Sequence, residues 1–195
     1  MSETIETAAP LTRRVGAGEL PGVGRYTIDK SHTSVGFVVR HVMVTKVRGQ
    51  FNEFEGEIVI GESAADSRVS LSIQVQSVDT RDAQRDAHLR TNDFFEAEKY
   101  PTITFVSTRV DEHGANWKVT GDLTIKGVTK PVVLDVEFNG AQRDPWGGIR
   151  IGYSASTEID RHDFGVNFNA AIEGGGVVVG AKVKIEIEAE AALAA

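Results

Sequence analysis

Hydrophobic and polar residues alternate with a period of two along most of this chain. The segment 68–75 is typical, because Val, Leu and Ile alternate there with Arg, Ser and Gln. A period of two means that one face of a strand is buried and the other is exposed. We predict strands at 24–30, 33–44, 47–60, 68–77, 102–111, 115–126, 131–140, 148–160 and 177–190. The pattern therefore indicates an all-β fold.

One stretch departs from this alternation. Between Asp79 and about Ala97, apolar residues such as Ala83 and Ala87 recur at helical spacing. Asp79 or Thr80 can cap the N-terminus of a helix there, because both residue types accept hydrogen bonds from free backbone N–H groups. We therefore predict one short amphipathic helix inserted into a sheet protein.

Short turns join several of the predicted strands. Residues 111–114 and 126–129 each carry a glycine at a turn position, which favours antiparallel hairpins. About eight antiparallel strands can close into a barrel, and closure removes exposed sheet edges. A barrel of that size holds either packed side chains or one small ligand, and the pattern leaves both open.

Composition and charge narrow the class of protein. The chain has 195 residues, which suggests one domain with a sizeable core. The net charge of -7 comes from dispersed carboxylates, whereas nucleic-acid binding requires clustered Lys and Arg, so we expect no nucleic-acid partner. The absence of cysteine excludes disulfides and thiolate metal sites.

The N-terminal residues do not continue the strand pattern. We assign residues 1–22 to an N-terminal extension and residues 23–195 to the barrel domain, and we expect Arg13 and Arg14 to be solvated. The first residues lack the basic and apolar regions of a signal peptide, and no window approaches the roughly 20 apolar residues that cross a bilayer. We therefore expect a cytoplasmic protein without a transmembrane segment.

Six motifs follow one another between Tyr26 and Glu190. They are YTIDKSHTSVGFVVRH (26–41), VRGQF (47–51), SVDTRDAQRDAHLRTNDFFEAEKYPTITF (77–105), GDLTIKGVTKPV (121–132), DPWGG (144–148) and DRHDFGVNFN (160–169). Together they resemble the YceI-like family of polyisoprenoid-binding, lipocalin-like proteins. The resemblance implies an extended eight-stranded antiparallel barrel with a short helix at one end. It also implies a long apolar cavity that holds an isoprenoid or a similar lipid chain.

The dimensions of such a barrel suit a linear lipid. A strand of about eleven residues is about 36 Å long, and a tilt near 40° leaves a depth of roughly 28 Å. Each buried CH₂ contributes about 0.8 kcal/mol, so a five-carbon isoprene unit contributes about 4 kcal/mol before ordering costs. We therefore expect the depth of the cavity to set the length of the bound chain.

Strand parity and position give the candidate ligand-binding residues. One face of the strand at 33–44 carries Val35, Phe37, Val39 and His41. Later strands supply aromatic wall residues, namely Phe105, Trp117, Phe138 and Tyr153. Irregular segments suited to an entrance or a plug carry Phe94, Phe95, Phe164 and Phe168. Ordinary core packing is the alternative for each of them.

A polar or pyrophosphate head on the lipid would require cations near the mouth of the cavity. Arg81, Arg85 and His88 in the predicted helix are the candidates for this head-group role. The alternative is a charged helix surface, in which Arg85 pairs with Asp82 or Asp86.

Other functions stay open at this point. Asp160, His162 and Asp163 form a compact polar cluster, but the histidines show no metal-ligand spacing, so we predict neither a metal nor a cofactor. The main alternative to a non-enzymatic lipid carrier is an enzyme acting on a lipophilic substrate, with His41 or His32 as acid or base. A third hypothesis is a filled barrel that acts only through protein contacts. An exposed strand or helix also leaves a homodimer open.

Overall fold

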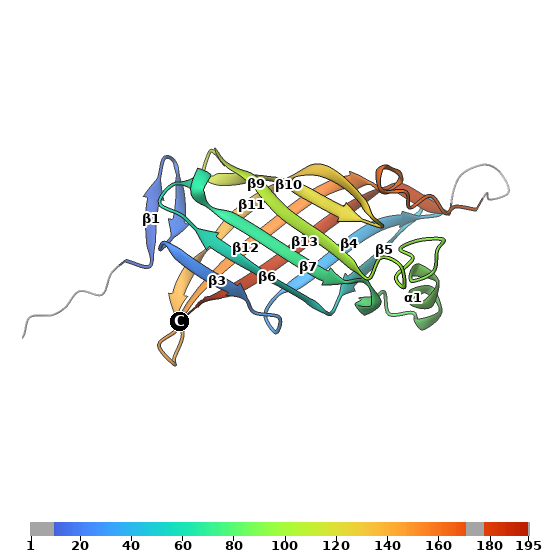
Figure 1. Cartoon of the computed structure of the whole chain (residues 1–195), viewed down its shortest axis with the longest axis horizontal. Coiled ribbons are helices and arrows are strands. Elements are labelled where there is room, and N and C mark those ends of the chain that lie inside the picture. Colours follow the sequence, from blue (N-terminus) through green and yellow to red (C-terminus); the bar gives the residue numbers. More distant parts are fainter. Residues whose placement is uncertain (1–9, 171–177, 195) are drawn as a thin grey trace, which may run out of the picture.

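In the computed structural model, which describes residues 10–170 and 178–194, antiparallel strands wrap around one long axis (Figure 1). The strands are β1 (Thr12–Val15), β2 (Gly18–Pro21), β3 (Gly24–Ile28), β4 (Ser34–His41), β5 (Thr45–Phe51), β6 (Phe54–Ile60), β7 (Arg68–Gln74), β8 (Val78–Asp79), β9 (Thr102–His113), β10 (Asn116–Ile125), β11 (Val128–Arg143), β12 (Ile149–Asp160) and β13 (Val179–Leu193). The helices are η1 (Ala64–Asp66), η2 (Val75–Ser77), α1 (Ala83–Leu89) and η3 (Arg161–Phe164). The predicted extension 1–22 and the predicted strand 177–190 lie partly outside the described residues.

Eight strands of the described chain close into a ring. Their order is β13, β12, β11, β10, β9, β7, β6 and β3, and β3 pairs again with β13. All of these pairings are antiparallel, which confirms the predicted barrel. β13 pairs with two strands along one of its edges: residues 191–193 pair with β3, and residues 179–188 pair with β4. β5 and β8 extend the sheet beyond β4.

The predicted strand 47–60 is interrupted after Phe51. The N–H of Asn52 donates to the carbonyl of Ser77 at 3.2 Å, and the carbonyl of Glu53 accepts from the N–H of Gln74 at 2.8 Å. These two bonds use backbone groups that would otherwise continue the strand. β5 and β6 therefore separate and pair with different neighbours, β4 on one side and β3 on the other.

The predicted helix exists but is shorter than 79–97. It starts after Asp82, whose carboxylate accepts hydrogen bonds from two N–H groups of the first turn. Asp79 is part of β8 instead, where it pairs with β5, so the prediction that Asp79 or Thr80 caps the helix is wrong. No helix of the described chain is long and apolar enough to cross a membrane.

The chain reverses direction directly after α1. The N–H of Phe94 donates to the carbonyl of Thr91 at 3.1 Å, and the N–H of Phe95 donates to the carbonyl of Leu89 at 3.0 Å. Glu96 then adopts a positive φ of 52°. These turns end the helix early and place both phenylalanines against the end of the barrel, where they join the main hydrophobic cluster.

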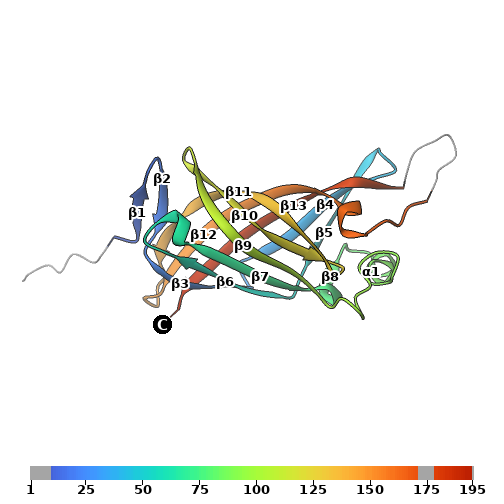
Figure 2. The same cartoon turned by 45° about the horizontal axis from the view of Figure 1, so that its top comes forward.

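An N-terminal hairpin lies at the end of the barrel opposite to α1 (Figures 1 and 2). β1 and β2 pair through residues 12–21, within the segment that we expected to be an extension. The prediction that Arg13 is solvated is wrong, because its guanidinium donates to the carbonyls of Gly61 and Glu62. Arg14 is exposed as predicted. The hairpin is therefore attached to the barrel wall.

Candidate ligand-binding cavity

A cavity of about 260 Å³ lies inside the barrel. Its wall extends from Leu20 and Trp117 at the hairpin end to Phe94 and Phe164 at the α1 end, and most of its residues are aliphatic or aromatic. The volume is just below the roughly 300–1,000 Å³ of common small-molecule sites. The alternation of the strands explains the wall, because inward positions of β10 and β12 carry apolar side chains.

Two glycines make room for aromatic rings in this wall. Phe105 lies over Gly121, where an added Cβ would come within 2.4 Å of its ring. Phe37 lies over Gly49 in the same way, with a distance of 2.3 Å to the missing Cβ. Both rings line the cavity. A side chain at either glycine would therefore push a ring into the space that a ligand would use.

Most of the predicted ligand-binding residues line the cavity, namely Val35, Phe37, Val39, Phe94, Phe95, Phe105, Trp117, Tyr153 and Phe164. His41, Phe138 and Phe168 are not part of its wall. His41 is exposed at the end of β4. The ring of Phe138 packs on Tyr153 with a centroid distance of 5.1 Å, and the ring of Phe168 packs on Phe94 at 5.0 Å. Phe138 and Phe168 therefore pack against wall residues without lining the cavity themselves.

The predicted head-group cations lie outside the cavity wall. Arg85 donates from Nε to Oγ1 of Thr80 and from Nη2 to the carbonyl of the same residue, both at 2.7 Å. His88 contacts a carboxylate oxygen of Asp93 through Nε2 at 2.7 Å. Arg81 and Arg85 line a separate polar groove of about 980 Å³ on the outside of the sheet. The structure thus gives these side chains local partners and does not gather them around the cavity.

One buried cation of the cavity wall was not found from the sequence. Arg161, in η3, is only 5% exposed, and its guanidinium donates to the carbonyls of Gly180 at 2.9 Å, Val166 at 2.6 Å and Val179 at 3.1 Å. Burial lowers the pKa of Arg161. Its position in the polar run Asp160 to Asp163 looked like an exposed turn, so the sequence held no signal of this role.

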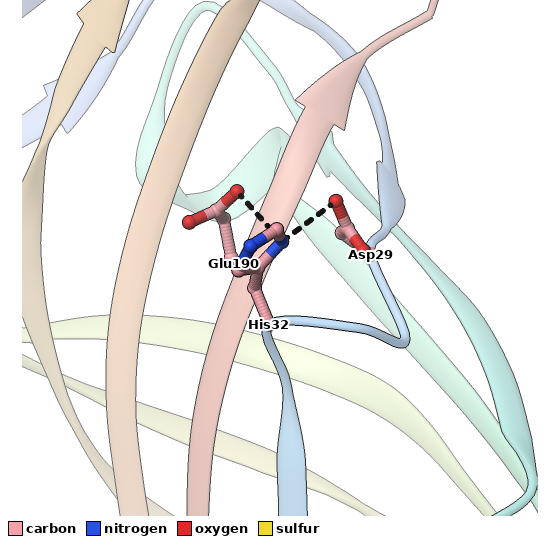
Figure 3. Close-up of side chains that lie close together, drawn as sticks. All are labelled: Asp29, His32 and Glu190. Atoms are coloured by element: carbon pink, nitrogen blue, oxygen red, sulfur yellow. Dashed lines mark hydrogen bonds and ion pairs between the residues drawn. The ribbon is translucent and has the colours of Figure 1, made fainter. Parts of the chain in front are cut away.

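A polar cluster lies where the chain passes from β3 to β4 (Figure 3). Side-chain atoms of Asp29, His32 and Glu190 lie within 4.8 Å of one another, and they include atoms that could hold a metal ion. Arg150 already supplies a positive charge there, because its guanidinium donates to Asp29, to Glu190 at 3.2 Å and to Asp144 at 3.1 Å. These ion pairs therefore connect the segment after β3, the loop before β12, and the strands β12 and β13.

Removal of one charge from this network should weaken the fold in a pH-dependent way. Ser31, His32 and Arg150 hydrogen-bond to Asp29 and hold the pKa of this carboxyl well below its usual range. A depressed pKa stabilises the folded state above about pH 4, and this contribution is lost as the pH falls toward the folded-state value. We expect Asp29→Asn to lower the free energy of unfolding by about 1–2 kcal/mol at neutral pH. Urea denaturation at a series of pH values measures it.

The matched control is Asp122→Asn, at an exposed position of β10. It removes the same charge outside the network, so its effect should stay within about 0.5 kcal/mol. The difference between the wild-type protein and Asp29→Asn should shrink in acid. A difference that stayed constant down to low pH would contradict the role given to the ionised carboxylate.

Comparisons with known proteins agree with this fold. A family model described as a YceI-like domain matches residues 26–191. A UPF0312 protein of Photorhabdus laumondii is 44% identical over 148 residues, which cover 74% of this chain and 76% of the relative. The solved Campylobacter jejuni YCEI protein is 34% identical with a TM-score of 0.69, over 86% of this chain and 96% of that structure. 

A third similar protein is a polyisoprenoid binding domain from Saccharophagus degradans. It is 19% identical with a TM-score of 0.63, over 89% of this chain and 100% of that structure, so the similarity concerns the fold. The hairpin of β1 and β2 lies before the range that the family model matches.

Proposed function

Because this chain belongs to the YceI-like family, we propose that it binds a polyisoprenoid or a similar long-chain lipid inside the barrel and stores, shields or carries it without chemical change. The observation that carries the proposal is the apolar cavity, whose wall extends from Trp117 near one end to Phe94 at the other. A linear apolar molecule fits such a space because it can contact the wall along its whole length.

The size of the cavity supports a chain-like ligand. Trp117 and Ile125 both line it from β10, and the eight steps between them correspond to about 27 Å of strand. A tilt of about 40° leaves about 20 Å along the barrel axis. About ten buried CH₂ groups would contribute about 8 kcal/mol, which is enough for micromolar affinity before ordering costs.

One similar solved structure supports the same class of ligand. The Saccharophagus degradans domain, which shares this fold, is described as polyisoprenoid binding. The wall described here offers such a molecule contacts from Val35, Phe105 and Leu123, which face the interior from three different strands. We propose that Phe94, Phe95 and Phe164 cover the end of the bound chain beside α1.

The positions of the histidines favour a binding role over the enzymatic alternative. His41 lies at the exposed end of β4, and His32 belongs to the polar cluster with Asp29. Neither residue lines the cavity. Turnover of a bound lipid over hours, lost in His41→Ala, would overturn the non-enzymatic proposal.

Native mass spectrometry of protein purified without detergent tests the proposal. We expect an added mass of one lipid per chain that disappears after organic extraction, and analysis of the extract then identifies the lipid. The extracted protein should take up farnesol, geranylgeraniol or solanesol when these prenols are supplied. A bare mass in both experiments would mean that the interior holds no such ligand.

A further inference from the structure

The N-terminal hairpin contributes Leu20 to the cavity wall. β1 and β2 cross the barrel at the end opposite to α1, as both views show (Figures 1 and 2). Leu20, the third residue of β2, is only 3% exposed and forms part of the cavity wall. The family model begins at residue 26, so this piece of wall comes from a segment outside the common barrel.

Leu20 faces the cavity because β2 alternates like a half-buried strand. Gly18 and Leu20 are buried, whereas Glu19 between them is exposed. Trp117 is 2% exposed and lines the same end of the cavity. An added Cβ on Gly18 would lie 2.7 Å from the Trp117 ring, so the absence of a side chain lets β2 lie directly on the indole. The strand thus presents Leu20 to the interior and Glu19 to solvent.

Polar contacts hold the hairpin in this position. The Arg13 guanidinium donates to the carbonyl of Glu62 at 2.6 Å and also to that of Gly61, at the end of β6. The N–H of Ala17 donates to the carboxylate of Glu112 on β9. The hairpin is therefore attached through Arg13 to the segment that follows β6 and through Ala17 to β9.

We propose that this hairpin is the end wall of the cavity and that Leu20 determines the maximum length of the bound lipid. The inference rests on the proposed function and makes it more specific. A longer chain must either displace Leu20 or leave carbons outside the cavity. Each CH₂ that stays unburied weakens binding about fourfold, so a few atoms at this position discriminate between chains of different length.

Substitutions of opposite size at Leu20 test this inference. Leu20→Ala should open the end wall and shift the preference toward longer prenols, whereas Leu20→Trp should shift it toward shorter ones. The probes are farnesol, geranylgeraniol and solanesol, offered together to extracted protein and compared by native mass spectrometry. We expect the ratio of longer to shorter prenol to change about 15-fold, which corresponds to a gain or loss of two CH₂ contacts. Glu19→Ala, on the exposed face of the same strand, is the matched control.

The possible outcomes separate the two proposals. If the wild-type protein takes up none of the prenols, the proposed function fails. If it binds prenols but Leu20→Ala and Leu20→Trp keep its length preference, only the role of Leu20 is overturned. Circular dichroism identifies variants that do not fold, and Leu20→Val then replaces Leu20→Ala as the smaller side chain. Equal shifts in Glu19→Ala would also overturn the assignment, because that side chain does not face the cavity.

Discussion

Replacement of Thr157 by Trp should abolish prenol uptake while the barrel stays folded. Thr157 faces the cavity from β12, between Ala155 and Ile159, which line the same wall. An indole at this position would occupy space that the proposed ligand needs. If it displaces at least four CH₂ groups, binding loses about 3 kcal/mol, or 100-fold or more. Native mass spectrometry with geranylgeraniol measures the loss.

The fold should tolerate this substitution because the side chain enters a hollow. Overpacking of a filled core costs about 1–3 kcal/mol, and an existing cavity should reduce that cost. Glu158→Trp is the matched control, since Glu158 is the adjacent residue and is exposed on the other face of β12. It adds the same side chain outside the barrel and should bind like the wild-type protein. Full binding by Thr157→Trp would mean that this part of the cavity is not used.

Replacement of Arg161 by Met should lower the free energy of unfolding more than Asp29→Asn does. Methionine fills a similar volume but donates no hydrogen bonds. Asn169 also donates to the carbonyl of Val179, at 2.9 Å, so this acceptor keeps a partner. The carbonyls of Gly180 and Val166 lose the Arg161 donors. Each unsatisfied buried group costs about 1–3 kcal/mol, which gives about 2–6 kcal/mol in total.

Thermal denaturation measures this effect. For a chain of this size 1 kcal/mol corresponds to about 2–4 °C, so the midpoint of Arg161→Met should fall by about 10 °C. Arg109→Met is the control, because Arg109 is exposed on β9 and pairs with Asp111 at the surface. Its midpoint should change by no more than about 2 °C. Equal midpoints for the two variants would show that the carbonyls find other partners.

Alternation identified the buried face of each strand but not its depth in the barrel. Val35, Phe37 and Val39 line the cavity as their parity predicts. His41 continues the same parity and yet is exposed, because β4 ends there, beyond the wall. Phe138 faces Tyr153 in a second hydrophobic cluster at the other end. A period of two reports the side of a strand, whereas the position along the axis depends on register and tilt.

The helix shows a similar limit. Spacing of apolar residues predicted a helix in the correct region, but several acidic and hydroxyl residues near its start could cap it equally well. Tertiary contacts made the choice: Asp79 joins β8, and the N–H of Thr80 donates to the buried Asp86 at 2.9 Å. Asp82 is then the residue in position to cap the first turn.

The sequence by itself determined the all-β class, the antiparallel strands, the region of helix α1 and most of the aromatic residues that line the cavity. These features follow from local alternation and from turn residues, which are written in neighbouring positions. Only the tertiary structure decided that β13 pairs with both β3 and β4, that Arg161 is buried and that Leu20 and Trp117 line the same cavity. Those contacts join residues far apart in the chain, so they depend on register and closure rather than on local pattern.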